Sequence, residues 1–218
     1  MADDIFLSQE EQDERAKKWL KDNGLAIGVG IALGFGAIFG YNQYKANIVA
    51  NAESASTLFA SALNAVRDSE NANIDAQFND LKANHADSSY ASKVVLMKAA
   101  QLTNSDYDAA YNELEWVVNN APEVGLVHTA RIRQVKINIA KGELDKAAAL
   151  ATQSSYDGFD SHYHELLGDI SALKGDNEAA ATSYQSAIDS LGASDAAYSR
   201  IIGLKRDRLP VSSDSQSQ

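Results

Sequence analysis

The side chains best suited to chemistry in this sequence are its four histidines, His85, His128, His162 and His164. His162 and His164 are close enough in sequence to raise the question of a metal site. Side chains two residues apart on a helix do not face the same way, so both could bind one ion only from an extended turn. No carboxylate triad or thiol completes such a site. We therefore expect all four histidines to have surface or packing roles, and we expect no bound metal.

Other kinds of reactive site are missing from the sequence as well. The 218 residues include no cysteine, which excludes disulfides, thiolate zinc sites and thiol catalysis. No glycine-rich phosphate loop and no nucleophile elbow is present. The acidic N-terminal stretch lacks the alternating oxygen ligands and the turn glycine of a calcium loop. The sequence therefore predicts a protein that is not an enzyme and that holds no cofactor.

The charge of the chain is acidic and unevenly distributed. The formal charge is −11, and residues 1–45 hold seven acidic and five basic side chains, so −9 falls on the rest of the chain. The phosphate backbone of a nucleic acid repels an acidic surface, so we expect no nucleic-acid binding. Only two prolines interrupt a chain rich in good helix formers, which indicates an all-α protein.

One uninterrupted apolar segment predicts a membrane-spanning helix. No charged residue occurs from Asn23 to Tyr44. The stretch from Gly24 to Tyr41 would span about 27 Å as a helix, close to the thickness of a bilayer's hydrocarbon core. A buried helix of a soluble protein would show a polar stripe, and this segment has none. The alternative is a cleavable signal peptide, but the preceding stretch is long and acidic, and no suitable cleavage site follows Gly40.

The direction of the span follows from the basic residues beside it. Four of them precede the apolar segment, namely Arg15, Lys17, Lys18 and Lys21. Only Lys45 lies within about 20 residues on the other side, so the positive-inside rule places the N-terminus in the cytoplasm. We therefore divide the chain into a cytoplasmic tail at 1–22, a transmembrane helix at 23–44, a soluble domain at 45–209 and a disordered tail at 210–218.

Small residues recur every four positions along the apolar segment. They would form one ridge on a helix, and such a ridge lets another membrane helix approach closely. The plainer explanation is that glycine is common in membrane helices, but a run of this length favours a helix–helix contact. The ridge residues are Gly24, Gly28, Ala32, Gly36 and Gly40.

The rest of the chain alternates short amphipathic segments with polar breaks, which predicts a series of helices. The expected helices are 48–67, 73–85, 90–103, 107–120, 125–141, 144–153, 161–174, 177–191 and 194–208. Alanines at positions 76, 110, 147 and 180 are spaced by 34, 37 and 33 residues, near the 34-residue period of a repeat made of helix pairs. Ala76, with Ala83, would belong to a degenerate first copy.

The segment 166–188 resembles a tetratricopeptide repeat. A small residue in such a repeat lets two helices pack closely, while an aromatic ring fills the space toward the next repeat. The matching residues are Leu167 and Gly168 in the first helix, Gly175 in the turn, and Ala180, Tyr184 and Ala187 in the second helix. His164 and Gly192 depart from the pattern, which usually has an aromatic residue and a proline there. Repeats of this kind stack into a solenoid whose concave face binds peptides or protein surfaces.

A tail of mixed charge, a glycine-rich span and four degenerate repeats together resemble the YfgM family of ancillary SecYEG translocon subunits in Gram-negative bacteria. The resemblance covers about residues 12–209. Its most telling stretches are AKKWLKDNGLAIGVGIALGFGAIFGYNQYKAN, ESASTLFASALNAV, the turn at Lys174–Asp176 and the closing IIGLKRDRL. It implies a single-pass inner-membrane protein of type II, with a cytoplasmic N-terminus and a periplasmic repeat domain beside the channel and a membrane-anchored chaperone of the PpiD type.

The resemblance also implies a function as an adaptor or chaperone that passes unfolded secreted proteins from the channel to periplasmic folding factors. The alternative is a structural scaffold for another envelope complex, in division or cell-wall assembly, or a regulator of envelope stress. An enzyme is a distant third hypothesis. The composition and spacing by themselves predict only the anchor, its direction and the repeat scaffold.

Overall fold

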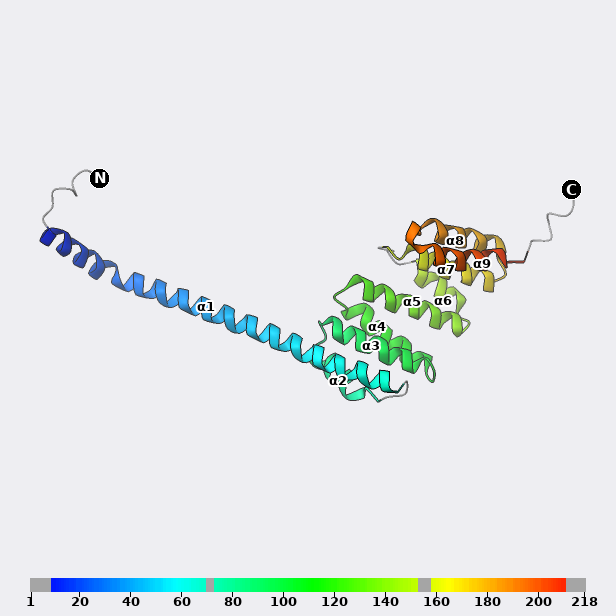
Figure 1. Ribbon diagram of the computed structural model, residues 1–218, viewed down its shortest axis with the longest axis horizontal. Coiled ribbons are helices and arrows are strands. Elements are labelled where there is room, and N and C mark those ends of the chain that lie inside the picture. The colour runs from blue at the N-terminus through cyan, green and yellow to red at the C-terminus, as the bar shows by residue number, and fades with distance from the viewer. Residues whose placement is uncertain (1–8, 70–72, 153–157, 211–218) are drawn as a thin grey trace. The chain divides into compact units, whose positions relative to one another are not determined.

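The computed structural model describes residues 9–69, 73–152 and 158–210, and all regular structure in these ranges is helical (Figure 1). The expected all-α fold is thereby confirmed. By internal contacts the chain divides into two compact units, residues 1–53 and residues 54–218.

The described part of the first unit is one helical stretch, the portion of α1 (Gln9–Asp68) up to Glu53. Its large apolar side chains are exposed: Leu25, Phe35 and Phe39 are 84%, 71% and 73% accessible. Among the described helices, α1 alone is long and apolar enough to cross a membrane, and no residue of its most apolar stretch is buried. This exposure distinguishes it from the core helix of a soluble protein, whose apolar side chains pack inside.

α1 is longer than the sequence predicted. We expected a span at 23–44 and a separate helix from residue 48, whereas one helix continues from Gln9 to Asp68. No proline or glycine occurs in α1 after Gly40, so no residue there favours a break. The interruption implied between the two predicted helices was therefore wrong.

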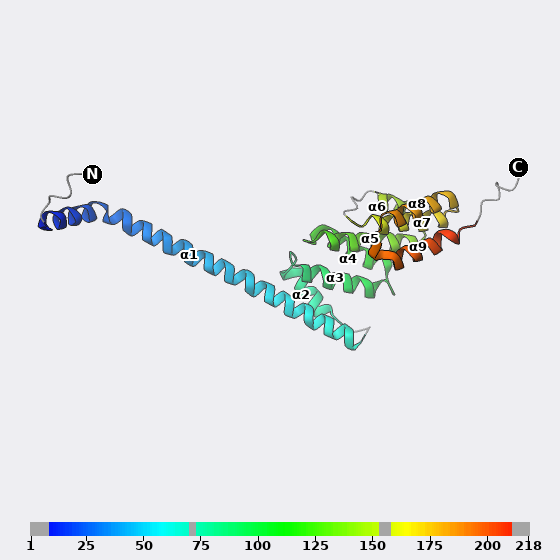
Figure 2. The same ribbon diagram turned by 45° about the horizontal axis from the view of Figure 1, so that its top comes forward.

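The second unit is a row of helices that begins with residues 54–68 of α1. From α2 to α9 each helix packs against the next, as Figure 1 and Figure 2 show. α3 also packs against α5, and α5 against α7. The first helices of the successive pairs α3–α4, α5–α6 and α7–α8 are therefore neighbours. The helices after α1 are α2 (Asp75–Asn84), α3 (Ser89–Leu102), α4 (Tyr107–Asn120), α5 (Val124–Ala140), α6 (Leu144–Thr152), α7 (Asp160–Leu173), α8 (Asn177–Asp189), the 3-10 turn η2 (Ala193–Asp195) and α9 (Ala196–Asp207). Each α-helix of this series lies within two residues of its predicted ends.

The turn between α7 and α8 explains why these two helices end where they do. Gly175 has a φ of 82°, a left-handed conformation that glycine adopts without a steric penalty. The N–H of Asp176 then donates to the carbonyl oxygen of Ser171 at 2.9 Å, which closes α7. The carboxylate of Asp176 accepts the N–H of Ala179 at 3.0 Å and caps α8. Gly142, with a φ of 74°, occupies the same place between α5 and α6.

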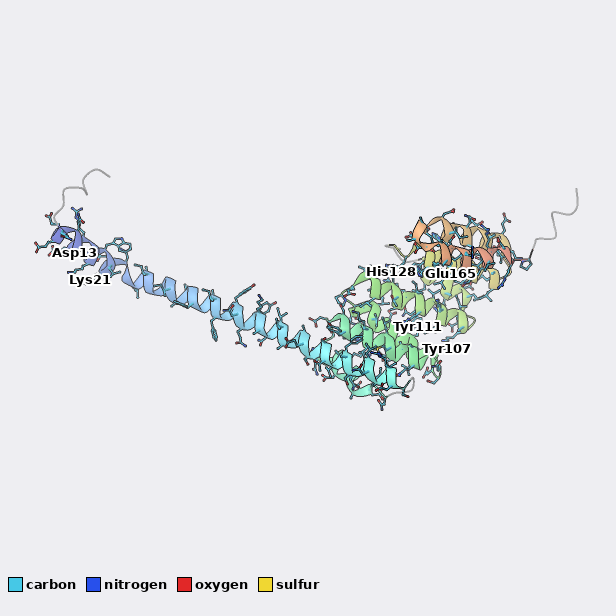
Figure 3. The ribbon with its side chains drawn as sticks, viewed as in Figure 1. Asp13, Lys21, Tyr107, Tyr111, His128 and Glu165 are labelled. Carbon is cyan, nitrogen blue, oxygen red and sulfur yellow. The ribbon has the colours of Figure 1, made fainter. Side chains whose placement is uncertain are left out.

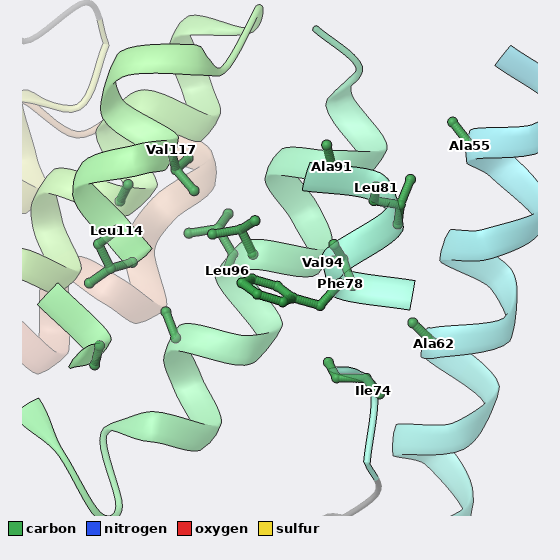
Figure 4. Packing of buried hydrophobic residues seen from close by; sticks show 14 of the residues in the cluster. Ala55, Ala62, Ile74, Phe78, Leu81, Ala91, Val94, Leu96, Leu114 and Val117 are labelled. Atoms are coloured by element: carbon green, nitrogen blue, oxygen red, sulfur yellow. The ribbon is translucent and has the colours of Figure 1, made fainter. Parts of the chain in front are cut away.

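The core of the first repeats is an apolar cluster to which α1, α2, α3 and α4 contribute (Figure 4). α1 supplies Ala55 and Ala62, and Ile74, Phe78 and Leu81 come from α2 and the residue before it. The last three are spaced by four and three residues, so they lie on one face of the helix. This stripe packs the first pair of helices onto the rest of the domain.

The alanine pattern holds for three repeats and fails for the first. Ala110, Ala147 and Ala180 are fully buried in α4, α6 and α8. Ala76 and Ala83 are exposed, so the prediction that they pack in a degenerate first copy was wrong. The larger apolar side chains of α2 occupy the buried face instead, because they remove more apolar surface from water than alanine does.

Candidate functional site

The small residues of the apolar segment have no neighbours within the chain. A Cβ atom added to Gly24, Gly28, Gly36 or Gly40 would meet no other atom within 4 Å. Ala32, between them, is exposed. The ridge is therefore open along α1, and its use as a helix-packing surface stays a prediction.

The matching residues of the repeat at 166–188 lie at contacts between helices. A Cβ atom added to Gly168 on α7 would lie 2.6 Å from the ring of Tyr184 on α8, so only glycine fits there without a shift of the ring. Tyr184, Ala180 and Ala187 belong to one buried cluster, and Leu167 packs against the neighbouring one. None of these five residues lines a pocket described below. They hold the helices in place.

Two of the four histidines, His128 and His162, make packing contacts with aromatic rings. Within the described ranges no group of three or more His, Asp or Glu side chains could hold a metal ion. His128 is buried, with Nδ1 2.9 Å from the hydroxyl oxygen of Tyr163 and its ring stacked on Phe159. The ring of His162 lies 5.3 Å from that of Tyr198, measured between centroids.

A site that the sequence analysis missed lies along α5. Two pockets of about 370 and 380 Å³ are both lined by Lys136, and we call them together the α5 groove. The first pocket is lined by Ala99, Ala100, Thr103, Tyr107, Leu114, Arg133, Lys136, Ile137 and Ala140, from α3, α4 and α5 and the turn between α3 and α4. The second is lined by Ile132, Lys136, His162, Glu165, Leu166 and Tyr198, from α5, α7 and α9. Figure 3 labels one residue of each pocket, Tyr107 and Glu165.

Two basic residues of α5, Arg133 and Lys136, line the groove one helical turn apart. Nη1 of Arg133 donates to the carbonyl oxygen of Leu96 at 2.9 Å, which fixes the guanidinium at the pocket. Burial lowers the pKa of the Arg133 guanidinium, yet arginine stays charged in proteins. Lys136 is exposed. The three bases of α5, Arg131, Arg133 and Lys136, without an acidic residue on the same helix were the sequence signal that could have indicated a cationic surface there.

A network of ion pairs and hydrogen bonds joins α7 and α9 at the second pocket. Nζ of Lys205 lies 2.7 Å from the carboxylate of Glu165 and 2.8 Å from that of Asp169. The hydroxyl of Tyr198 donates to Glu165, and the hydroxyl of Tyr184 donates to Asp169 at 2.7 Å. Because α7 supplies both carboxylates while α9 supplies Lys205 and Tyr198, the network attaches the terminal helix to the repeats.

The charge states of this network follow from its surroundings. Burial opposes ionisation of Glu165, but the hydrogen bonds from Lys205 and Tyr198 and the positive charges of Lys205 and Lys136 hold the pKa of Glu165 below its ordinary value. Burial, and hydrogen bonds to carboxylates, raise the pKa of Tyr184 and of Tyr198. At neutral pH the groove therefore presents two cations beside apolar carbon, with a paired carboxylate at one end, an arrangement suited to binding.

Comparisons with known proteins find similarity over most of the chain. The sequence matches the family described as a tetratricopeptide repeat-like domain over residues 17–211. It is 29% identical to the ancillary SecYEG translocon subunit of Aggregatibacter actinomycetemcomitans, over 86% of this chain and 93% of that protein. Proteins with the same description are 26% identical in Haemophilus influenzae, over 83% of this chain and 89% of the relative, and 23% identical in Escherichia coli K12, over 86% and 90%. No solved structure matches the chain significantly.

Proposed function

This chain belongs to the tetratricopeptide repeat-like family, and from that premise we propose that it is an inner-membrane ancillary subunit of the SecYEG translocon. The family match and the description shared by three relatives also confirm the resemblance to the YfgM family. The observation that carries the proposal is the extent of the matches. They cover about nine-tenths of each relative, and the family match over residues 17–211 includes both the apolar segment and the repeats.

The topology is part of the proposal. The bases before the apolar segment favour a cytoplasmic tail at 1–22 and a span at 23–44, and the domain at 45–209 then lies in the periplasm. The exposed apolar side chains of the first unit support the span, because a helix that is apolar on every side is stable in lipid and not in water.

The two units would have separate tasks. The ridge of small residues would dock the span against a membrane helix of the channel complex, since close packing replaces the hydrophobic effect in lipid. The repeats would bind protein segments on the periplasmic side, as stacked helix pairs do. Their partners would be unfolded secreted proteins and a periplasmic chaperone of the PpiD type, so the protein would act as an adaptor between channel and folding factors and not as an enzyme.

The test is co-purification of the tagged, full-length chain from membranes solubilised in a mild detergent. Channel subunits should elute with the chain in amounts well above those found with an unrelated single-span protein of similar abundance. Recovery of division or cell-wall assembly proteins without the channel would refute the proposal and favour the scaffold hypothesis. If the tagged chain recovers no channel subunits, and a strain that lacks the protein shows altered envelope-stress signalling, the regulator hypothesis would be favoured.

A further inference from the structure

We propose that the α5 groove binds an extended peptide segment in which an acidic residue lies between two aliphatic residues. The inference rests on the proposed function, because it gives the chemistry of a segment that the repeats would hold. Three observations carry it: two cations without a carboxylate at ion-pair distance among the described residues, the aliphatic side chains in both pockets, and the presence of Lys136 in the lining of each pocket.

The charge of the groove is the first observation. Within the described ranges, neither Arg133 nor Lys136 has a carboxylate at ion-pair distance. For Lys136 this is unusual among the lysines of a domain that carries an excess of acidic side chains. Most of its other lysines have such a partner, as the pairs Lys82–Glu113, Lys98–Asp75, Lys141–Asp108, Lys146–Glu143, Lys174–Asp145 and Lys205–Glu165 show.

A third pocket provides a comparison within the same domain. It has about 420 Å³, lies around the α5–α6 turn and is also lined by two cations, Lys141 and Lys146. There Lys141 lies 2.6 Å from Asp108, and Lys146 lies 2.9 Å from Glu143, so the chain itself neutralises both charges. In the α5 groove the nearby Glu165 is paired with Lys205 and acts on Lys136 only through space, so a ligand carboxylate could still contact Lys136.

The position of Arg133 is suited to a carboxylate. A guanidinium has five N–H donors in one plane, and the carbonyl oxygen of Leu96 accepts from Nη1. The side chain is half-buried, and burial lowers its pKa, which means that the site stabilises the cation less well than water does. A ligand carboxylate would restore that stabilisation through charge-assisted hydrogen bonds.

The lining of the pockets requires apolar side chains on both sides of the acid. In the first pocket, Ala99, Leu114 and Ile137 present carbon to the space beside Arg133. In the second, Ile132 and Leu166 present carbon on the other side of Lys136, next to the polar side chains of His162, Glu165 and Tyr198. Because Lys136 lines both pockets, a segment crossing from one to the other would bring its central residue to the cation.

A nucleic acid or an anionic lipid fits these observations less well than a peptide. Both present rows of phosphates, which need an extended basic surface, and this domain is strongly acidic. The groove offers two neighbouring cations and aliphatic side chains in each of its two pockets, which corresponds to one carboxylate with an aliphatic side chain on either side.

The experiment compares two peptides, GSGLDLGSG and GSGLNLGSG, each blocked at both ends and carrying a neutral fluorophore. Their binding to the full-length chain in detergent is followed by fluorescence anisotropy. We expect the aspartate peptide to bind about tenfold more tightly than the asparagine peptide, since an ion pair replaces a neutral hydrogen bond. Equal affinities would overturn the proposal. A third peptide, GSGLL with a free carboxylate, distinguishes the source of the acid, and a stronger Lys136-dependent affinity for it would show that the groove recognises a chain terminus instead.

Variants connect that preference to the groove. Lys136→Met should reduce the aspartate preference to about twofold or less, because it removes the exposed cation without changing the pocket walls. Lys174→Met removes a lysine that lines neither pocket of the groove, and its preference should equal that of the wild type. Ala100→Trp should weaken both peptides alike by filling the first pocket, and Ala100 is exposed, so the fold tolerates the change. A preference that persists in Lys136→Met would place the recognition elsewhere.

The wild-type chain and the Lys136→Met variant are then both tested for co-purification of channel subunits. If peptide selectivity is absent while the wild-type chain still recovers the channel, the ligand chemistry is wrong and the proposed function stands. If selectivity depends on Lys136 but the wild-type chain recovers no channel, the groove stands and the proposed function is wrong.

Discussion

In the first unit, Leu25, Phe35 and Phe39 project from α1 with more than two-thirds of their surface accessible. In the second unit, apolar side chains such as Leu114 and Val117 have no accessible surface and lie on one face of their helix. Both regions are helical, so the difference is not one of secondary structure. Apolar residues on all sides of a helix require an apolar solvent, whereas a stripe of them requires another helix.

Both patterns occur within α1. Its apolar stretch has no buried residue, but Ala55 and Ala62, farther along the same helix, are fully buried in the core of the repeats. Helix continuity therefore says nothing about where one environment ends and the next begins. The contacts that residues make with the rest of the chain do, and they place the beginning of the second compact unit at Ser54.

The largest expected difference between the two regions is in access to a reagent. The chain has no cysteine, so Glu10→Cys and Ser105→Cys each introduce a single thiol, and both positions are exposed. In cells with a permeabilised outer membrane, an impermeant thiol reagent should label Ser105→Cys and leave Glu10→Cys unlabelled, because the positive-inside rule puts the tail in the cytoplasm. Both should label after lysis. Labelling of Glu10→Cys alone in unlysed cells would reverse the topology.

A charge placed in the repeat core should cause the largest loss of stability. Ala180→Glu puts a carboxylate at a fully buried position without a partner, so we expect a loss of about 3–5 kcal/mol in the free energy of unfolding. The matched control is Ala83→Glu, at an exposed position of α2, which should change it by less than about 0.5 kcal/mol. Urea unfolding followed by circular dichroism measures both. Similar effects in the two variants would show that the repeat register described above is wrong.

A single methyl group tests the packing of α7 on α8. Gly168→Ala brings a Cβ atom to 2.6 Å from the ring of Tyr184, and such overpacking should cost about 1–3 kcal/mol. Gly203→Ala, in α9, meets no atom within 4 Å and should stabilise its helix by about 0.5–1 kcal/mol. Opposite signs are expected in the same unfolding assay. A stabilised Gly168→Ala variant would mean that the tyrosine ring moves freely.

The network between α7 and α9 should make part of the stability depend on pH. The pKa of Glu165 is lower in the folded chain than its ordinary 4.5, so its contribution is present above pH 4.5 and is lost as the pH falls below that value. Glu165→Gln should therefore cost about 1–2 kcal/mol at pH 7 and flatten the acid limb of the stability curve. Glu178→Gln, at an exposed position, should leave the curve unchanged. An acid limb that is the same in Glu165→Gln as in the wild type would contradict the assignment.

The smallest effect on the domain is expected from changes in the span. Gly28→Ile combined with Gly36→Ile should leave the unfolding of the repeats unaltered, because both positions lie in the first unit. The same variant should recover less of the channel on co-purification, since bulky side chains hold membrane helices apart. Leu25→Ile combined with Leu33→Ile, off the ridge, is the control and should behave as wild type. If the inserted double-glycine variant recovers the channel fully, the ridge is not the docking surface.

These comparisons also show which predictions the sequence supports. Helix ends were predictable to within two residues from α2 to α9, because they depend on local signals such as the turn at Gly175 and the cap at Asp176. The exposure of Ala76 and Ala83 was not predictable, because an alanine carries little information about the face that a helix buries. The neighbouring Ile74, Phe78 and Leu81 decide that face.

The sequence by itself determined the apolar helix, the all-α composition and the order of the helices. Each of these depends on a regular spacing along the chain, which is visible without coordinates. Only the tertiary structure revealed the α5 groove and the network that joins α7 to α9. Ala100, Leu114 and Ile137 are separated by more than ten residues from one another and come from three helices. Whether they enclose a pocket beside Arg133 depends on how those helices pack. No local pattern in the sequence encodes the distances between three helices.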